Sequence, residues 1–224
     1  MARIVVITAG GRGRRMGGAL PKQFAEIGGR PVLMHTIAKF WGWNRDAEIL
    51  VTLPPDMVGF WRTLCENFAF KLPHRIIEGG ESRYRSVANA LAVAGDGLIG
   101  VHDGVRPFVS EAVIEACFAA AQIHGGAVPV VDMLESIREL GADGASWAVD
   151  RRRFVVVQTP QVFRSDLLKA AYRQPERADF TDEASVVEAH GGKVSTAPGN
   201  VENIKLTQPM DMWLADQMLK QRRL

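Results

Sequence analysis

The chain of 224 residues is 47% hydrophobic, carries a formal net charge of +2 at pH 7 and contains two cysteines, Cys65 and Cys117. This length suits one domain with a substantial core, the near-neutral charge argues against a nucleic-acid binder, and two distant cysteines predict reduced thiols in a cytoplasmic protein. The apolar runs are much shorter than the ~20 residues of a membrane span, and "IVVI" near the N-terminus is too short for a signal peptide.

Short β-branched segments alternate with segments of helical periodicity along most of the chain. The predicted strands are residues 3–8, 48–53, 74–78, 98–102 and 127–131, and the predicted helices between them are residues 35–41, 56–68, 86–94 and 111–124. Later in the chain we expect helices over 165–173 and 181–189, a strand over 193–197 and a final helix from about residue 208. This alternation predicts an α/β, Rossmann-like fold, with a mostly parallel sheet and helices on both faces.

Residues 132–157 interrupt the alternation of strands and helices. Two β-prone runs flank a turn signal between Gly141 and Gly144. This pattern predicts a β-hairpin that protrudes from the sheet. We call residues 132–157 the arm.

The loop after the first strand, "AGGRGRRMGGALPKQF", combines glycines with a cluster of cations. A dinucleotide-binding G-x-G-x-x-G started from Gly11 fails at Met16, and a P-loop fails because Ala19 and Leu20 follow Gly18. Glycines let the backbone approach an anion, and arginine and lysine side chains bind phosphate oxygens. Because ligands of parallel sheets bind beyond the carboxyl ends of the strands, the loop predicts a site for a phosphorylated ligand.

This loop resembles the signature of sugar-phosphate nucleotidyltransferases, and more narrowly that of the 2-C-methyl-D-erythritol 4-phosphate cytidylyltransferase family of the non-mevalonate isoprenoid pathway. The similarity continues, in the family's order, through "PVLMHTIAKF", "GGESRYRSVANAL", "VHDGVRPFV", "VDR", "QTPQVF", "TDEASVVEAHGG" and "GNVENIKLT". It implies a single nucleotidyltransferase domain over residues 1–224. Such an enzyme joins CTP and 2-C-methyl-D-erythritol 4-phosphate, giving 4-diphosphocytidyl-2-C-methyl-D-erythritol and pyrophosphate.

The resemblance also implies a set of site residues. The catalytic cations would be Arg15, Lys22 and Lys205. The nucleotide would be bound by Ala9, Gly10, Gly11, Gly13, Gly80, Glu81, Ser86 and Asp103, and Asp103 would also help to bind Mg²⁺. The sugar phosphate would be bound by Gly104, Arg106, Arg151, Thr159 and Thr181. In this family the arm reaches over the neighbouring subunit, so we expect a homodimer in which Arg151 serves the partner's site. His102, beside Asp103, is expected to be structural.

One departure from the family keeps a second substrate open. The family usually has threonine after the aspartate of the arm's first strand, whereas this chain has Met133 after Asp132. Methionine cannot donate a hydrogen bond to phosphate, and the alternative is a cytidylyltransferase for another polyol phosphate, such as ribitol 5-phosphate. Two further hypotheses are a nucleotide-sensing module without catalysis, which the intact cations disfavour, and a dehydrogenase, which the failed fingerprint disfavours.

Overall fold

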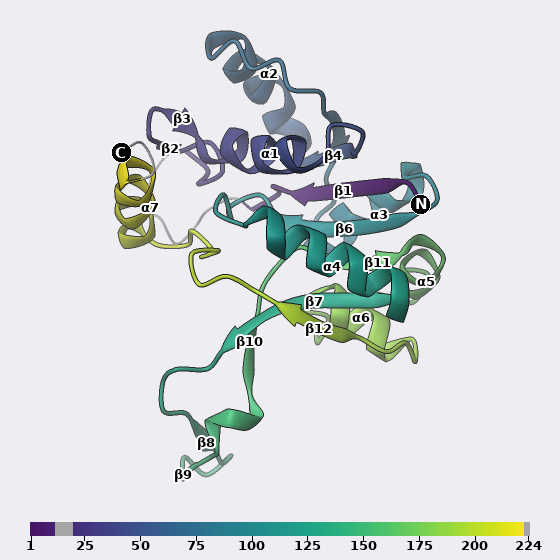
Figure 1. The fold of residues 1–224 in the computed structure, drawn as a ribbon, viewed down its shortest axis with the longest axis vertical. Coiled ribbons are helices and arrows are strands. Elements are labelled where there is room, and N and C mark those ends of the chain that lie inside the picture. The colour runs from purple at the N-terminus through teal and green to yellow at the C-terminus, as the bar shows by residue number, and fades with distance from the viewer. Residues whose placement is uncertain (12–19, 222–224) are drawn as a thin grey trace.

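A computed structural model describes residues 1–11 and 20–221 of the chain. Over those residues, a mixed eight-stranded sheet has the order β10-β7-β11-β6-β1-β4-β5, with β12 also paired to β7 (Figure 1). Its strands are β1 (Arg3–Thr8), β4 (Glu48–Leu53), β5 (Arg75–Glu78), β6 (Leu98–Asp103), β7 (Gly126–Asp132), β10 (Val155–Val157), β11 (Gln161–Arg164) and β12 (Ser195–Pro198). β1 is parallel to β4 and β6, and β4 to β5, so the centre of the sheet is parallel, as predicted.

Helices cover both faces of the sheet because the central strands are apolar on both sides. In β1, Val5 and Ile7 pack into one core with α1, α2 and α4, whereas Ile4 and Val6 pack into another with α3, α5 and α6. The helices are α1 (Val32–Trp43), α2 (Val58–Asn67), α3 (Arg83–Val93), α4 (Glu111–His124), α5 (Ser165–Ala171), α6 (Glu183–Ala189) and α7 (Pro209–Gln221). None of the helices in the described ranges is both long and apolar enough to cross a membrane.

The predicted strands and helices are all present, with ends within three residues of those in the structure. The sequence does not predict β11, which lies antiparallel between β6 and β7. Pro160 marks the start of β11, but the strand has only four residues and leads without a turn into α5, so its pattern is too short to predict a strand. The two-residue strands β2 (Glu26–Ile27) and β3 (Arg30–Pro31) are also too short for a periodic signal, and α7 packs against β2.

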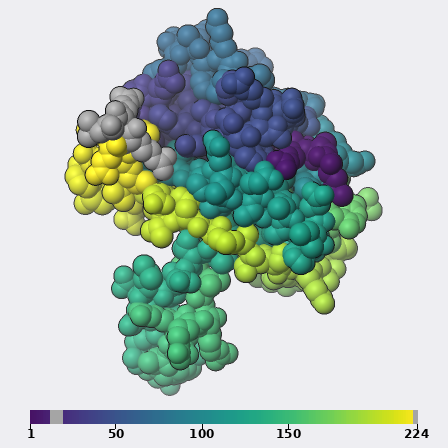
Figure 2. All heavy atoms as spheres, viewed as in Figure 1, coloured from purple at the N-terminus to yellow at the C-terminus, as the bar shows by residue number. Residues whose placement is uncertain are grey.

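The arm projects from the end of β7 as a β-rich excursion, as predicted (Figures 1 and 2). At its tip, β8 (Arg138–Leu140) and β9 (Ser146–Ala148) pair around the predicted turn. The short 3₁₀ helix η3 (Arg151–Arg153) follows, and β10 then returns antiparallel to β7. The arm carries exposed apolar side chains along its length: Leu134, Leu140, Trp147, Phe154, Val155, Val156 and Val157.

Both cysteines are free thiols, with Cys117 buried and Cys65 partly buried. Burial raises the pKa of both, to about 12 for Cys117 and, together with the nearby Glu66 carboxylate, to about 11 for Cys65. Each is therefore protonated at pH 7 and packs as a small apolar residue. The cytoplasmic location stays a prediction.

Candidate active site

A pocket of about 330 Å³ opens beyond the carboxyl ends of β1 and β6, where Thr8 and Asp103 are register partners. Its walls come from the turn after β1, the start of α3, the end of β6 and the segment before α7. The lining residues are Thr8, Ala9, Gly10, Gly11, Lys22, Gln23, Gly80, Glu81, Ser82, Arg83, Ser86, Asp103, Val105 and Lys205. This is the sheet edge at which α/β proteins bind ligands.

The turn before α3 forms one wall of this pocket through close backbone packing. The Gly80 N–H donates to Ser86 Oγ at 3.1 Å, and Ser86 Oγ donates to the Ser82 carbonyl at 2.9 Å. A Cβ on Gly80 would lie 2.3 Å from the Cβ of Arg85, so glycine is required there. Ser86 is only 3% exposed, and its hydroxyl therefore shapes the turn in addition to lining the pocket.

Asp103 carries the carboxylate around which three cations of the site gather. Its Oδ2 lies 3.1 Å from both Arg106 Nε and Lys205 Nζ, and its Oδ1 lies 3.8 Å from Arg83 Nε. Burial alone would raise the pKa of Asp103, but Lys205, Arg83 and Arg106 together hold it well below its ordinary value. The carboxylate is thus ionised at neutral pH, with three cations around it.

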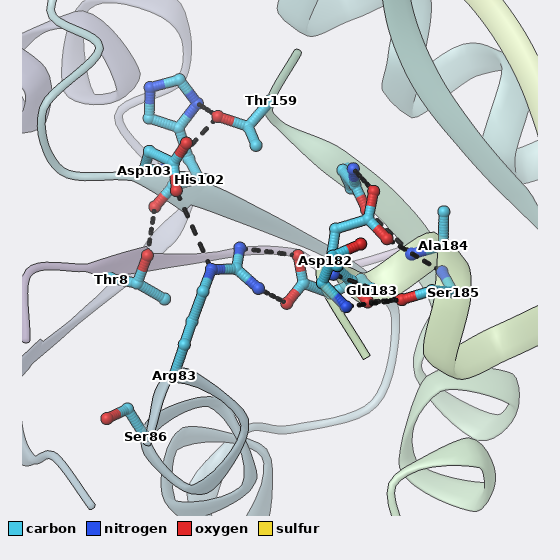
Figure 3. Close-up of polar contacts among 12 residues, drawn as sticks. Thr8, Arg83, Ser86, His102, Asp103, Thr159, Asp182, Glu183, Ala184 and Ser185 are labelled. Carbon is cyan, nitrogen blue, oxygen red and sulfur yellow. Dashed lines mark hydrogen bonds and ion pairs between the residues drawn. The ribbon is translucent and has the colours of Figure 1, made fainter. Parts of the chain in front are cut away.

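His102 and Thr159 hold the end of β6 in place behind Asp103 (Figure 3). His102 Nε2 lies 3.0 Å from the Arg106 carbonyl oxygen. Because a carbonyl oxygen can only accept a hydrogen bond, Nε2 carries the proton, and Nδ1 accepts a hydrogen bond from Thr159 Oγ1 at 3.0 Å. The same hydroxyl accepts from the Asp103 N–H at 3.1 Å. Burial lowers the pKa of His102 to about 4, so the ring is neutral at pH 7. These contacts support the prediction that His102 is structural.

A smaller pocket of about 110 Å³ adjoins the first on the other side of Asp103. The two pockets share Arg83, Asp103 and Lys205. The remaining walls of the smaller pocket are Arg106, Val157, Gln158, Thr159, Gln161, Thr181 and Asp182. Two ligands could therefore bind side by side, with cations on both sides of the boundary.

The structure brings most of the predicted site residues together. The larger pocket is lined by Ala9, Gly10, Gly11, Lys22, Gly80, Glu81, Ser86, Asp103 and Lys205, and the smaller one by Arg106, Thr159 and Thr181. Gly104 is buried behind the pockets, where its N–H donates to the Thr8 carbonyl. Arg151 lies in the arm, where it donates to the Leu134 carbonyl, and it is on neither pocket wall. Gly13 and Arg15 lie outside the described residues. The roles of all these residues stay predictions.

The pocket walls also contain residues that were not predicted, among them Gln23 and Arg83, and the buried Glu183 lies behind Arg83. Gln23 is buried and donates to the Ala9 carbonyl at 2.7 Å, which fixes the turn after β1. Arg83 lies between the two pockets and forms a two-pronged ion pair with the buried Glu183. Arg83 and Glu183 lie within the motifs "GGESRYRS" and "TDEASVVEA", so the motifs mark both positions. The ion pair between them could not be predicted, because the two residues are 100 positions apart in the sequence.

The larger pocket contains carboxylate oxygens of the kind that bind magnesium. Asp103 and Glu81 are the two acids on the wall of the larger pocket, as far as the structure describes it. Within the same residues, no three acidic, histidine or cysteine side chains cluster into a metal cage. Magnesium at phosphate-transfer sites is held by one or two carboxylates together with substrate phosphates. The residues present therefore fit such an ion.

Comparison with known proteins agrees with this geometry. The family model of 2-C-methyl-D-erythritol 4-phosphate cytidylyltransferase matches residues 3–221. A protein of that name from Phocaeicola vulgatus is 50% identical to this chain, and the match covers 98% of this chain and 100% of the relative. A second, from Porphyromonas gingivalis, is also 50% identical, and the match covers 97% of each chain. The crystal structure of the same enzyme from Thermus thermophilus is 35% identical, with a TM-score of 0.81, over 98% of this chain and 100% of that one. The chain belongs to the 2-C-methyl-D-erythritol 4-phosphate cytidylyltransferase family.

Proposed function

We propose that the chain transfers the cytidylyl group of CTP to 2-C-methyl-D-erythritol 4-phosphate. The products are 4-diphosphocytidyl-2-C-methyl-D-erythritol and pyrophosphate. Family membership over residues 3–221 supports the activity. The observation that carries it to this site is the pair of adjoining pockets that share Asp103, Arg83 and Lys205, because the reaction needs two phosphorylated substrates held against each other.

The chemistry needs positive charge and alignment more than proton transfer. An oxygen of the sugar phosphate attacks the α-phosphorus of CTP, and the bond to pyrophosphate breaks as negative charge grows on the leaving group. A phosphate monoester has its second pKa near ~6, so the nucleophile is already ionised at neutral pH. The neutral His102, enclosed by Thr159 and the Arg106 carbonyl, is consistent with a mechanism without a general base.

The two pockets suggest where each substrate binds. The larger pocket, with its backbone-lined turn at Gly80, suits the cytosine and the triphosphate, which Lys22 and Lys205 would neutralise. The smaller pocket, with Thr181 and Arg106, suits the phosphate of the sugar. Lys205 reaches both pockets, so it would stabilise the phosphates at the point where they react. Arg15 is assigned to the triphosphate by family resemblance.

We further propose that Mg²⁺ is the cofactor. Asp103 would hold it together with the triphosphate, and Glu81 is the second acid within the same pocket. When bound, the ion supplies charge neutralisation on the phosphates. Lys205 and Arg106 now share one oxygen of Asp103, while Arg83 faces the other from 3.8 Å.

The test is pyrophosphate release with a panel of nucleoside triphosphates and polyol phosphates. We expect turnover with CTP and 2-C-methyl-D-erythritol 4-phosphate and little with ribitol 5-phosphate. Preference for ribitol 5-phosphate would favour the alternative that Met133 left open. CTP binding without pyrophosphate release from any polyol phosphate would favour a binding module.

The arm supports the proposal of a homodimer. A hairpin cannot bury its apolar side chains alone, and Leu134 and Leu140, 70% and 77% exposed, have no cover from their own chain. Packing against a second copy would bury them and would carry Arg151 to the neighbour's site.

Complementation tests this arrangement. Lys22→Ala and Arg151→Ala chains should each be nearly inactive, whereas co-refolding them should restore about a quarter of the wild-type activity. In a mixed dimer one site inherits both lesions and the other neither, and half of randomly paired dimers are mixed. No recovery, with heterodimers verified by mass, would place Arg151 outside the partner's site.

A further inference from the structure

Glu183 is a fully buried carboxylate close to both pockets. Its two oxygens accept from Arg83 Nη1 at 2.5 Å and Arg83 Nη2 at 2.9 Å, and Tyr172 donates its hydroxyl to the first of them at 3.1 Å. Glu183 is 0% exposed, and neither pocket is lined by it. It therefore acts on any ligand only through Arg83.

Arg83 connects Glu183 to Asp103, as Figure 3 shows. The two terminal nitrogens of its guanidinium face Glu183, and its Nε faces Asp103 Oδ1 at 3.8 Å, beyond hydrogen-bond distance. Arg83 also lies on the walls of both pockets. Burial lowers the pKa of Arg83, but the Glu183 carboxylate more than offsets this, so the chain of charges is Glu183⁻, Arg83⁺, Asp103⁻.

A role in stability alone does not explain this pair. Desolvating two charges costs about as much as their attraction returns, and well-packed apolar residues often replace buried ion pairs without loss. The Glu183 side chain instead determines which way the Arg83 fork points. If Glu183 lost its charge, the nearest carboxylate to Arg83 would be that of Asp103. The Arg83 guanidinium could then turn toward Asp103 and bind Oδ1, the oxygen that Lys205 and Arg106 do not contact.

We propose that Glu183 is a positioning residue that acts through Arg83 to keep Asp103 Oδ1 available to the magnesium ion that accompanies CTP. The proposal rests on the proposed function for the identity of the nucleotide. Glu183 restrains the competing cation, and it also holds Arg83 between the pockets.

The test is the magnesium requirement of Glu183→Gln, which keeps the size of the side chain and removes its charge. We expect the Mg²⁺ concentration for half-maximal pyrophosphate release to rise by about tenfold, the usual effect of losing a partner of a metal ligand. Calorimetry should measure CTP binding without the second substrate, both with and without Mg²⁺. Glu183→Gln should bind CTP more weakly than the wild type when Mg²⁺ is present and equally well when it is absent. Glu115→Gln is a control with the same pair geometry, because Glu115 makes two hydrogen bonds with the Arg3 guanidinium, at 2.8 and 2.9 Å, at the surface and away from both pockets.

A double-mutant cycle separates positioning from folding. If Glu183 acts through Arg83, Glu183→Gln should change the magnesium requirement by less than about twofold in an Arg83→Gln background. The full effect in that background, or a wild-type magnesium requirement in Glu183→Gln, would overturn the proposal.

Two further outcomes keep the result interpretable. If Glu183→Gln does not fold, Tyr172→Phe removes one hydrogen bond from Glu183 and leaves the ion pair. It should raise the magnesium requirement by a smaller factor, and no change would count against the proposal. If wild-type protein fails to release pyrophosphate from CTP, the proposed function is wrong, and the calorimetry still decides whether Glu183 controls magnesium-dependent nucleotide binding.

Discussion

Asp103→Asn removes one negative charge from the centre of the site and changes the size of the side chain very little. In the structure, this carboxylate lies 3.1 Å from Arg106 and Lys205 and 3.8 Å from Arg83. The Arg106 side chain is only 13% exposed, and its other hydrogen bond goes to the neutral carbonyl of Asn203. After the substitution, Arg106 would be a desolvated cation without a carboxylate partner.

The loss of stability can be worked out from this burial. Removing one partner of a buried ion pair costs about 3–5 kcal/mol, because the other charge stays away from water. The lower end applies here, since Lys205 is 42% exposed and can turn to solvent, and Arg83 keeps Glu183. We therefore expect the free energy of unfolding to fall by about 3 kcal/mol. Urea unfolding at pH 7 measures it, as a lower midpoint with an unchanged slope.

The same substitution should act oppositely on binding and on turnover. Because the wall of the larger pocket loses one negative charge next to Lys205, metal-free CTP should bind more tightly in calorimetry, while pyrophosphate release in Mg²⁺ falls. Asp166→Asn is the control, because it breaks the Arg164–Asp166 pair, whose side chains are 50% and 66% exposed, and should leave all three quantities unchanged. An unfolding free energy equal to that of the wild type in Asp103→Asn would refute the reasoning.

Three other substitutions test separate parts of the molecule. Lys22→Ala should lower kcat by the equivalent of about 2–3 kcal/mol, with a smaller effect on KM for CTP, if its charge acts on the leaving pyrophosphate; a near-normal kcat would contradict this. Gly80→Ala should weaken CTP binding and lower Tm, because its Cβ would meet another side chain at 2.3 Å, whereas Gly59→Ala, with nothing within 4 Å, should do neither. Burial holds the pKa of His74 below its ordinary value, and its ring accepts a hydrogen bond from Trp61 at 3.0 Å. Since unfolded histidine takes up a proton near pH ~6.5, the free energy of unfolding should decline as pH falls below that value, and His74→Asn should reduce the decline in urea titrations from pH 7 to pH 5.

Local patterns predict the central fold well because each element carries its own signal. Ile4 to Ile7 are apolar on both sides of one short strand, which is typical of a parallel strand between two layers of helices. β11 carries no such signal, because Val162 and Phe163 are fixed by pairing with β6 and β7, whose residues are distant in sequence. Non-local pairing of a short segment is a property of the assembled sheet.

The site shows the same division. Family motifs predict Lys22, Asp103 and Lys205, and the topology brings them to one pocket. The partnership of Arg83 with Glu183 is absent from the predictions, because an arginine and a glutamate in separate motifs look like ordinary surface charges until α3 and α6 are placed together. Motifs therefore identify residues that line the pockets better than the buried residues behind them.

The chain leaves the main body at Asp132 and re-enters it at Val155, and these two residues are cross-strand partners. The intervening segment is thus a long loop whose two ends are held together by the pairing of β7 with β10. Lengthening such a loop has a small entropic cost, since each doubling of its length raises the free energy of loop closure by only about 0.6 kcal/mol. The turn around Gly144, between the two tip strands, can therefore change in length while the pocket at the sheet edge stays constant.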